Sequence, residues 1–124
     1  MYEFKFIEQG KGVIKIDDFE EAFESDLSYW PQSQYEAHWQ QAKTAIGWGR
    51  SACFITSITD PKHSNFIRTW VCHPINGKLV FQECILFLDE LDTPFNINSP
   101  HLNVQPYESV SEDGEQISKW VTNE

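Results

Sequence analysis

The sequence predicts a single α+β domain, in which one main helix packs on an antiparallel β-sheet of about five to seven strands. Short runs of β-forming residues recur along the chain, two pairs of them are joined by glycine turns, and one segment has a clear helical period. The chain has 124 residues, of which 40% are apolar and 15% aromatic. It is long enough to bury one core but too short for a catalytic domain plus a second module. We therefore expect residues 1–124 to form one domain.

The first element is expected to be a β-hairpin followed by an acidic segment. Residues 2–8 alternate between polar and apolar side chains, and residues 13–16 follow a glycine-containing turn. Residues 17–26 are the most acidic part of the chain, since six of these ten residues are Asp or Glu. The spacing of Phe19, Ala22 and Phe23 predicts a short helical turn with an acidic outer side.

The main helix has signals at both ends. Ser33 and Glu36 form a Ser-x-x-Glu capping box, and Gly47 is placed to end the helix. Its apolar face is formed by residues at i, i+4, i+7 and i+11, namely Tyr35, Trp39, Ala42 and Ile46. We predict a helix over about residues 33–46, with Trp39 as a core anchor rather than a platform for a ligand.

A second hairpin is expected around Asn76-Gly77. Both turn residues tolerate positive φ, and β-rich runs precede and follow them. A two-residue loop pairs Ile75 with Lys78, which fixes the register. That register places eight side chains on one face: Phe66, Arg68, Trp70, Cys72, Phe81, Glu83, Ile85 and Phe87.

Arg68 and Glu83 are diagonal neighbours in this register. We interpret them as a mutually neutralised structural pair, because an isolated buried charge is costly. The alternative is a pocket around Arg68, Trp70 and Glu83, which would make the chain a small intracellular enzyme or ligand-binding domain. Packed side chains without a cavity would argue against that alternative.

Three further segments complete the chain. Residues 52–59 form another β-rich run that precedes the second hairpin. Residues 93–106 contain Pro and Asn and are expected to be a long loop with room for one short strand. Residues 116–122 suggest a last strand, in which Ile117 or Trp120 packs against the core.

Motifs for catalysis or metal binding are absent from the sequence. There is no C-x-x-C, H-x-x-x-H or H-E-x-x-H, and neighbours such as Cys72 and His73 point to opposite faces of a strand. No G-x-S-x-G elbow is present, and the carboxylates occur in solvated runs where nothing would tune their pKa values. We expect no catalytic residue, no metal and no cofactor, and we expect the three cysteines to be reduced thiols.

The acidic residues are segregated. Residues 1–30 carry eight Asp or Glu against three Lys, residues 31–82 carry two acidic and five basic side chains, and residues 83–124 carry nine acidic residues against one Lys. The net charge of −10 disfavours binding to nucleic acid or to an anionic membrane. No signal peptide or membrane span is recognisable, so a cytoplasmic location is expected.

Two acidic clusters are therefore candidate binding surfaces for a basic partner. Charge runs are usually only solvated surface, but clustered carboxylates can also pair with Lys and Arg of a partner and steer its approach. Such a surface suits an inhibitor that occupies the cationic groove of a nuclease, whereas a subunit of a larger assembly would expose a broad apolar patch. The candidate residues are Asp17, Asp18, Glu20, Glu21, Glu24, Asp26, Asp89, Glu90 and Asp92.

Four groups of residues carry a resemblance to a known family. They are Leu27-Ser28-Tyr29-Trp30, Tyr35-x-x-x-Trp39, Asn65-Phe66-Ile67-Arg68-Thr69-Trp70-Val71 and Gly114-Glu115-Gln116-Ile117-Ser118-Lys119-Trp120. From about Val13 onward the chain resembles the CdiI immunity proteins of bacterial contact-dependent growth inhibition systems. It is most similar to those whose CdiA toxin is a ribosomal RNA nuclease of the colicin type.

The resemblance implies a strongly curved antiparallel sheet with a helix and no enzymatic activity. It also implies tight one-to-one binding to a cognate CdiA C-terminal toxin, without a small-molecule ligand. Immunity proteins diverge where they touch their partner, so the matching landmarks are expected in the core. The unmatched acidic segments are expected to carry specificity.

Overall fold

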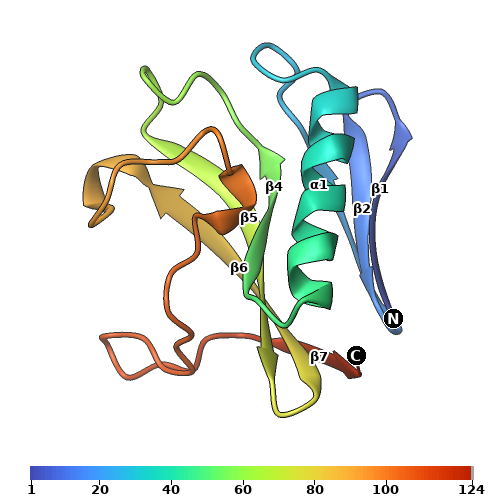
Figure 1. Cartoon of the computed structure of the whole chain (residues 1–124), viewed down its shortest axis with the longest axis vertical. Helices are drawn as coiled ribbons and strands as arrows, with labels where there is room; N and C mark the ends of the chain where they lie inside the picture. Colours follow the sequence, from blue (N-terminus) through green and yellow to red (C-terminus); the bar gives the residue numbers. More distant parts are fainter. Residues whose placement is uncertain (124) are drawn as a thin grey trace.

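The computed structural model, which describes residues 1–123, has seven strands, one long helix and two short 3-10 helices in that range (Figure 1). The predicted α+β class is confirmed, and the strands are divided between two antiparallel sheets. One sheet has the order β1-β2-β3 and the other β4-β5-β6-β7. The bounds are β1 (Tyr2–Glu8), β2 (Lys11–Ile16), β3 (Phe19–Glu24), α1 (Gln32–Gly47), β4 (Ala52–Ser57), β5 (Phe66–Ile75), β6 (Lys78–Phe87), η1 (Leu88–Glu90), η2 (Pro100–Leu102) and β7 (Trp120–Asn123).

The three-stranded sheet contains the predicted first hairpin and corrects the next element. Residues 19–24 form strand β3 along β2, so the predicted helical turn is wrong. Phe19 and Phe23 are four residues apart, and this spacing places two side chains on one face of a strand as well as of a helix. Ala22 decides between the two, because it is exposed while both Phe side chains are half-buried.

Helix α1 lies between β4 and the three-stranded sheet (Figure 1). The predicted apolar face is confirmed, since Tyr35, Trp39, Ala42 and Ile46 are all buried. Trp39 is the predicted anchor: its ring stacks on Phe6 with centroids 4.9 Å apart, and its Nε1 donates a hydrogen bond of 2.8 Å to the Ile55 carbonyl of β4. The helix thereby joins the two sheets.

Helix α1 differs from the prediction at its N-terminus but not at its C-terminus. No side-chain capping bond forms at the start, because Pro31 is the N-cap and Gln32 already begins the helix. The predicted capping box is therefore wrong. The helix ends at Gly47 as predicted, and Gly49 adopts the left-handed φ of 81° that lets the Arg50 N–H bond back to the Ala45 carbonyl.

The β5–β6 hairpin confirms the predicted register from Ile75 opposite Lys78 to Phe66 opposite Phe87. Asn76 and Gly77 have φ values of 52° and 78°, as a two-residue turn with positive φ at both positions requires. Strand β7 then pairs with the first four residues of β6. It is shorter than predicted, and its Trp120 contacts Trp70 with ring centroids 5.1 Å apart.

The remaining segments close the core. The loop over residues 93–106 contains η2 and no strand among its residues, and η2 contacts both β4 and α1. Cys53 and Cys72 are buried and Cys84 is half-buried, and within residues 1–123 the cysteines form no disulfide. The described part of the chain contains no helix that is both long and apolar enough to cross a membrane.

Candidate functional site

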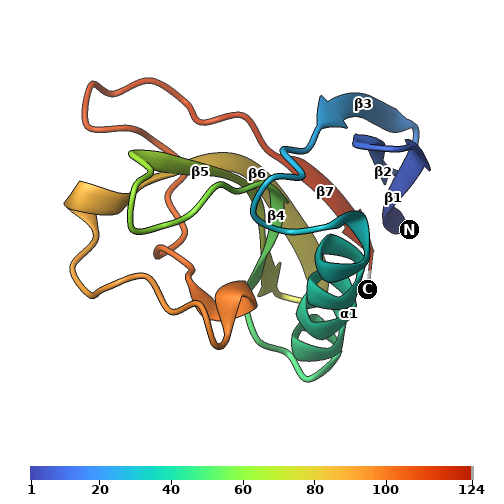
Figure 2. The same cartoon turned by 90° about the horizontal axis from the view of Figure 1, so that it is seen from above.

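The two predicted acidic clusters lie far apart on the molecule. The first cluster, residues 17–26, consists of the β2–β3 turn, the edge strand β3 and the residues after it. The second, residues 89–92, lies at η1 and directly after it. In Figures 1 and 2, η1 projects from one side of the molecule and the three-stranded sheet forms the opposite side. The fold therefore does not merge the clusters into one surface.

Strand β3 divides the carboxylates of the first cluster between two faces. Glu20 and Glu24 point outward, and Lys15 of β2 reaches Glu20 at 3.6 Å. Glu21 points to the same side as the half-buried Phe19 and Phe23. Burial, together with the nearby Glu83 carboxylate, raises the pKa of Glu21.

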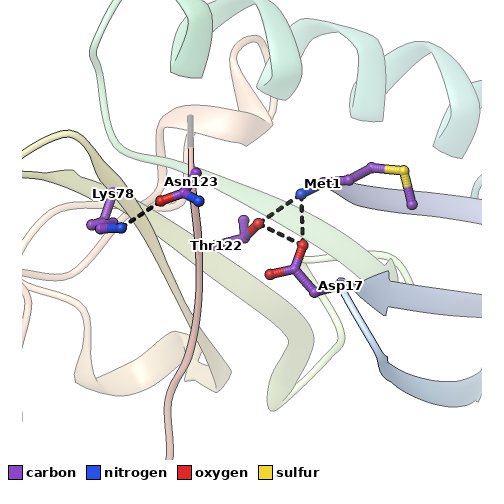
Figure 3. A network of polar contacts seen from close by, with 5 residues as sticks. All are labelled: Met1, Asp17, Lys78, Thr122 and Asn123. Carbon is purple, nitrogen blue, oxygen red and sulfur yellow. Dashed lines mark hydrogen bonds and ion pairs between the residues drawn. The ribbon is translucent and has the colours of Figure 1, made fainter.

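Asp17 is engaged in a network within the protein (Figure 3). The Met1 amino group donates hydrogen bonds to Asp17 Oδ1 at 2.8 Å and to Thr122 Oγ1 at 2.6 Å, and the Thr122 hydroxyl also donates to Asp17 Oδ1. The bond from the amino group is the main cause that lowers the pKa of Asp17. Because Thr122 belongs to β7, this network ties the two sheets together.

Asp26 also has a local structural role. Its Oδ1 accepts hydrogen bonds from the hydroxyl and the backbone N–H of Ser28, and these bonds lower its pKa. Within residues 1–123 there are three ion pairs, and they involve Asp17, Glu3 and Glu20. Most other acidic side chains, including Asp89 and Glu90, are exposed and remain available to a partner.

An exposed apolar group lies beside the second acidic cluster. Phe66 and Phe87 face each other across β5 and β6 with ring centroids 6.5 Å apart, and they are 43% and 48% exposed. The Arg68 guanidinium lies 5.4 Å from the centroid of the Phe66 ring. Aromatic and Arg side chains are the types that most often dominate protein interfaces.

The alternative pocket around Arg68, Trp70 and Glu83 does not form. Trp70 is 2% exposed and packs against both Phe19 and Trp120. Arg68 and Glu83 line separate cavities. The interpretation of these two charges as a neutralised pair is also wrong, since no ion pair joins them in the described residues. Both side chains are exposed, so water solvates each charge.

The sequence reasoning missed a groove of about 420 Å³ beside strand β6. Its apolar lining includes Leu86, Leu91 and Ile117. Its acidic lining residues come from three parts of the chain: Glu83 of β6, Glu90 of η1, and Glu108 and Glu112 of the loop before β7. The sequence signal was only the excess of acidic residues after residue 82, because the groove depends on a loop folding back beside β6.

Metal binding finds no support in the part of the chain that the structure describes, where no three His, Cys, Asp or Glu side chains are grouped to hold an ion. His38 and His101 do have a buried Nδ1 without a hydrogen-bond partner among residues 1–123. Two nitrogens alone do not provide the usual tetrahedral ligand set of a zinc site.

Comparisons with known proteins agree with this architecture. The family model described as the CdiI N-terminal domain matches residues 25–124. The immunity protein CdiI of Enterobacter cloacae subsp. cloacae is 32% identical over 116 residues, which cover 89% of this chain and 76% of that protein. A chain of the CdiA-CT/CdiI toxin and immunity complex from Enterobacter cloacae is similar in structure, with a TM-score of 0.77 and 29% identity over 91% of this chain and 77% of that chain.

Proposed function

This chain belongs to the CdiI family of immunity proteins, and from that premise we propose that it binds and neutralises the C-terminal toxin domain of a cognate CdiA protein. The structural relative from Enterobacter cloacae belongs to a toxin and immunity complex. We propose one-to-one binding without any chemical step by this chain. Residues 1–124 act as one binding domain, and they meet the toxin in the cytoplasm.

The observation that carries the finer proposal is the unpaired acidic surface. The net charge is −10, yet three ion pairs account for all those within residues 1–123. The negative electrostatic field of such a protein attracts a cationic partner and accelerates the association of the two proteins. Nucleases bind polyanions through cationic grooves, so we propose that the toxin is a nuclease, with RNA as its substrate.

Both acidic clusters belong to this proposal, but with different roles. Since they lie on opposite sides of the molecule, a toxin domain of ordinary interface size would cover one of them. The second cluster, Asp89, Glu90 and Asp92, adjoins exposed Phe66 and Phe87 and is the better contact surface. The first cluster, formed by Asp17, Asp18, Glu20, Glu21, Glu24 and Asp26, then contributes mainly to long-range attraction.

Calorimetric titration of this protein into the purified C-terminal domain of its cognate CdiA protein tests the proposal. We expect one-to-one binding with a free energy of about −12 kcal/mol, which corresponds to nanomolar affinity, and weaker binding as salt increases. The toxin domain should degrade RNA when it is alone and should not degrade RNA in the complex. Absence of binding would refute the immunity function for this pair of proteins. Degradation of DNA rather than RNA would refute only the proposed substrate.

Two variants with equal charge change separate contact from attraction. Asp89→Lys, Glu90→Lys and Asp92→Lys together change the net charge as much as Asp18→Lys, Glu20→Lys and Glu24→Lys together. Both triple variants should slow association, because both reduce the field. Only the change at residues 89–92 should also speed dissociation, by about 10-fold or more. Equal effects on dissociation would remove residues 89–92 from the contact surface.

A further inference from the structure

The second half of strand β6 has a backbone edge without a strand partner. The two-residue turn makes Ile75 and Lys78 a hydrogen-bonded pair, and such pairs alternate along an antiparallel ladder. The backbone groups of Gln82, Cys84 and Leu86 therefore point toward β5. Those of Glu83, Ile85 and Phe87 point away from β5, toward the outer edge of the sheet.

Strand β7 covers only the first half of that edge. Its pairing with β6 ends at Phe81 opposite Trp120. Within residues 1–123, no other backbone group bonds to the outward N–H or C=O groups of Glu83, Ile85 and Phe87. Proteins usually protect a free edge with Lys, Pro or a bulge. Residues 83–87 contain neither Lys nor Pro, and their register with β5 is unbroken.

The acidic groove of about 420 Å³ runs beside this free edge. Four Glu residues line it, and the lining contains no Lys or Arg. The side chain of Glu83 lies on the same face of β6 as Ile85 and Phe87, so the carboxylates on the groove side are those of Glu90, Glu108 and Glu112. The Nε2 of Gln82 donates to the Glu108 carbonyl at 2.9 Å, which holds the loop that forms the far wall. The volume lies in the range of ordinary binding pockets, about 300–1,000 Å³. Its charge selects a positively charged occupant.

We propose that an extended segment of the toxin domain, carrying Lys or Arg, adds to β6 as a further strand along residues 83–87. This inference rests on the proposed function and names the surface that performs it. Backbone hydrogen bonds to Glu83, Ile85 and Phe87 hold the segment, and its side chains alternate between two sides. One set reaches the groove and its carboxylates. The other set contacts Ile85 and Phe87, which are 40% and 48% exposed.

The substitution Ile85→Pro tests the backbone part of the proposal. Proline removes an N–H that points outward, so the β5–β6 ladder loses no hydrogen bond, and proline is tolerated at such edge positions. Val121→Pro is the matched control. Val121 lies on the edge strand β7, where it is exposed and pairs with Val80 of β6, and its N–H also points outward. Binding to the purified toxin domain should weaken about 10- to 100-fold for Ile85→Pro and change less than about threefold for Val121→Pro.

A second pair of variants keeps the test informative even if Ile85→Pro does not fold. Glu108→Lys with Glu112→Lys reverses the charge inside the groove, whereas Glu36→Lys with Glu115→Lys makes the same change of net charge outside it. The first pair should weaken binding by at least about 10-fold more than the second. Similar losses for both pairs would overturn the groove as the site.

Amide hydrogen exchange of the wild-type protein, alone and in the complex, reports directly whether the free edge of β6 becomes hydrogen-bonded. The amides of Glu83, Ile85 and Phe87 should become protected when the toxin domain binds, and the amide of Val121 should not. Tight binding without this protection would overturn strand addition but leave the immunity function intact. Failure of the wild-type protein to bind would instead refute the proposed function.

Discussion

The buried histidine of α1 gives the protein a pH-dependent stability. His38 is 1% exposed, and its Nε2 accepts a hydrogen bond of 2.8 Å from the Ile55 N–H of β4. Burial is the main cause that lowers its pKa to about 3, and the nearby His101 adds to this effect. Protonation would place a charge in the core and remove the acceptor that Ile55 needs. The folded protein therefore holds His38 neutral.

The magnitude follows from the difference between the two states. In the unfolded chain the pKa of a histidine is about 6.5, so between about pH 6.5 and pH 3 the unfolded state binds a proton that the folded state does not. The free energy of unfolding then falls by about 1.4 kcal/mol for each pH unit of acidification. Above about pH 6.5 the contribution is constant. From about pH 7.5 to pH 5, His38 should remove about 2 kcal/mol of stability.

Urea unfolding followed by tryptophan fluorescence, with wild type and His38→Gln compared at both pH values, measures this contribution. Glutamine can accept the Ile55 N–H but does not titrate, and the remaining titratable groups are the same in both proteins. The stability advantage of the wild type should therefore shrink by about 2 kcal/mol on acidification. An advantage that stays constant within about 0.5 kcal/mol would refute the reasoning.

Two further substitutions test the packing of the three-stranded sheet and of helix α1, and thermal or urea unfolding measures each. Gly12→Ala should cost about 1–3 kcal/mol, because a Cβ there would lie 2.4 Å from the Phe23 ring; an unchanged midpoint would show that Phe23 moves freely. Trp39→Ala should cost about 3–5 kcal/mol, since it removes the stacking on Phe6 and the bond to β4. Trp48→Ala is its control, because Trp48 is 82% exposed, and it should change stability by less than about 0.5 kcal/mol.

Local patterns predicted those elements whose signals come from neighbours in the chain. The α1 helix follows from the apolar period that includes Tyr35 and Trp39, and the β5–β6 register follows from Asn76-Gly77. Strand β3 was mispredicted because its two Phe side chains fit either period. Its state depends on hydrogen bonds from β2, a tertiary partner that overrides local spacing.

The charges show a similar division. The acidic runs were visible in the sequence, but their partners were not: Asp17 bonds with Met1 and Thr122, residues from opposite ends of the described chain. Arg68 and Glu83 were expected to neutralise each other because both share a face with Trp70. The two sheets bury Trp70 but leave both charges in water, so no pairing is needed.

The sequence by itself determined the fold class, the helix, the central hairpin and the acidic surface, because apolar periodicity, turn chemistry and net charge are local or additive properties. Only the tertiary structure decided which strand edge stays open and which carboxylates meet beside it. Glu90 and Glu112 are far apart in the chain, and they line one groove only because the pairing of β6 with β7 ends at Phe81 and the loop before β7 folds back along β6. Such contacts depend on how distant segments pack, which no local pattern specifies.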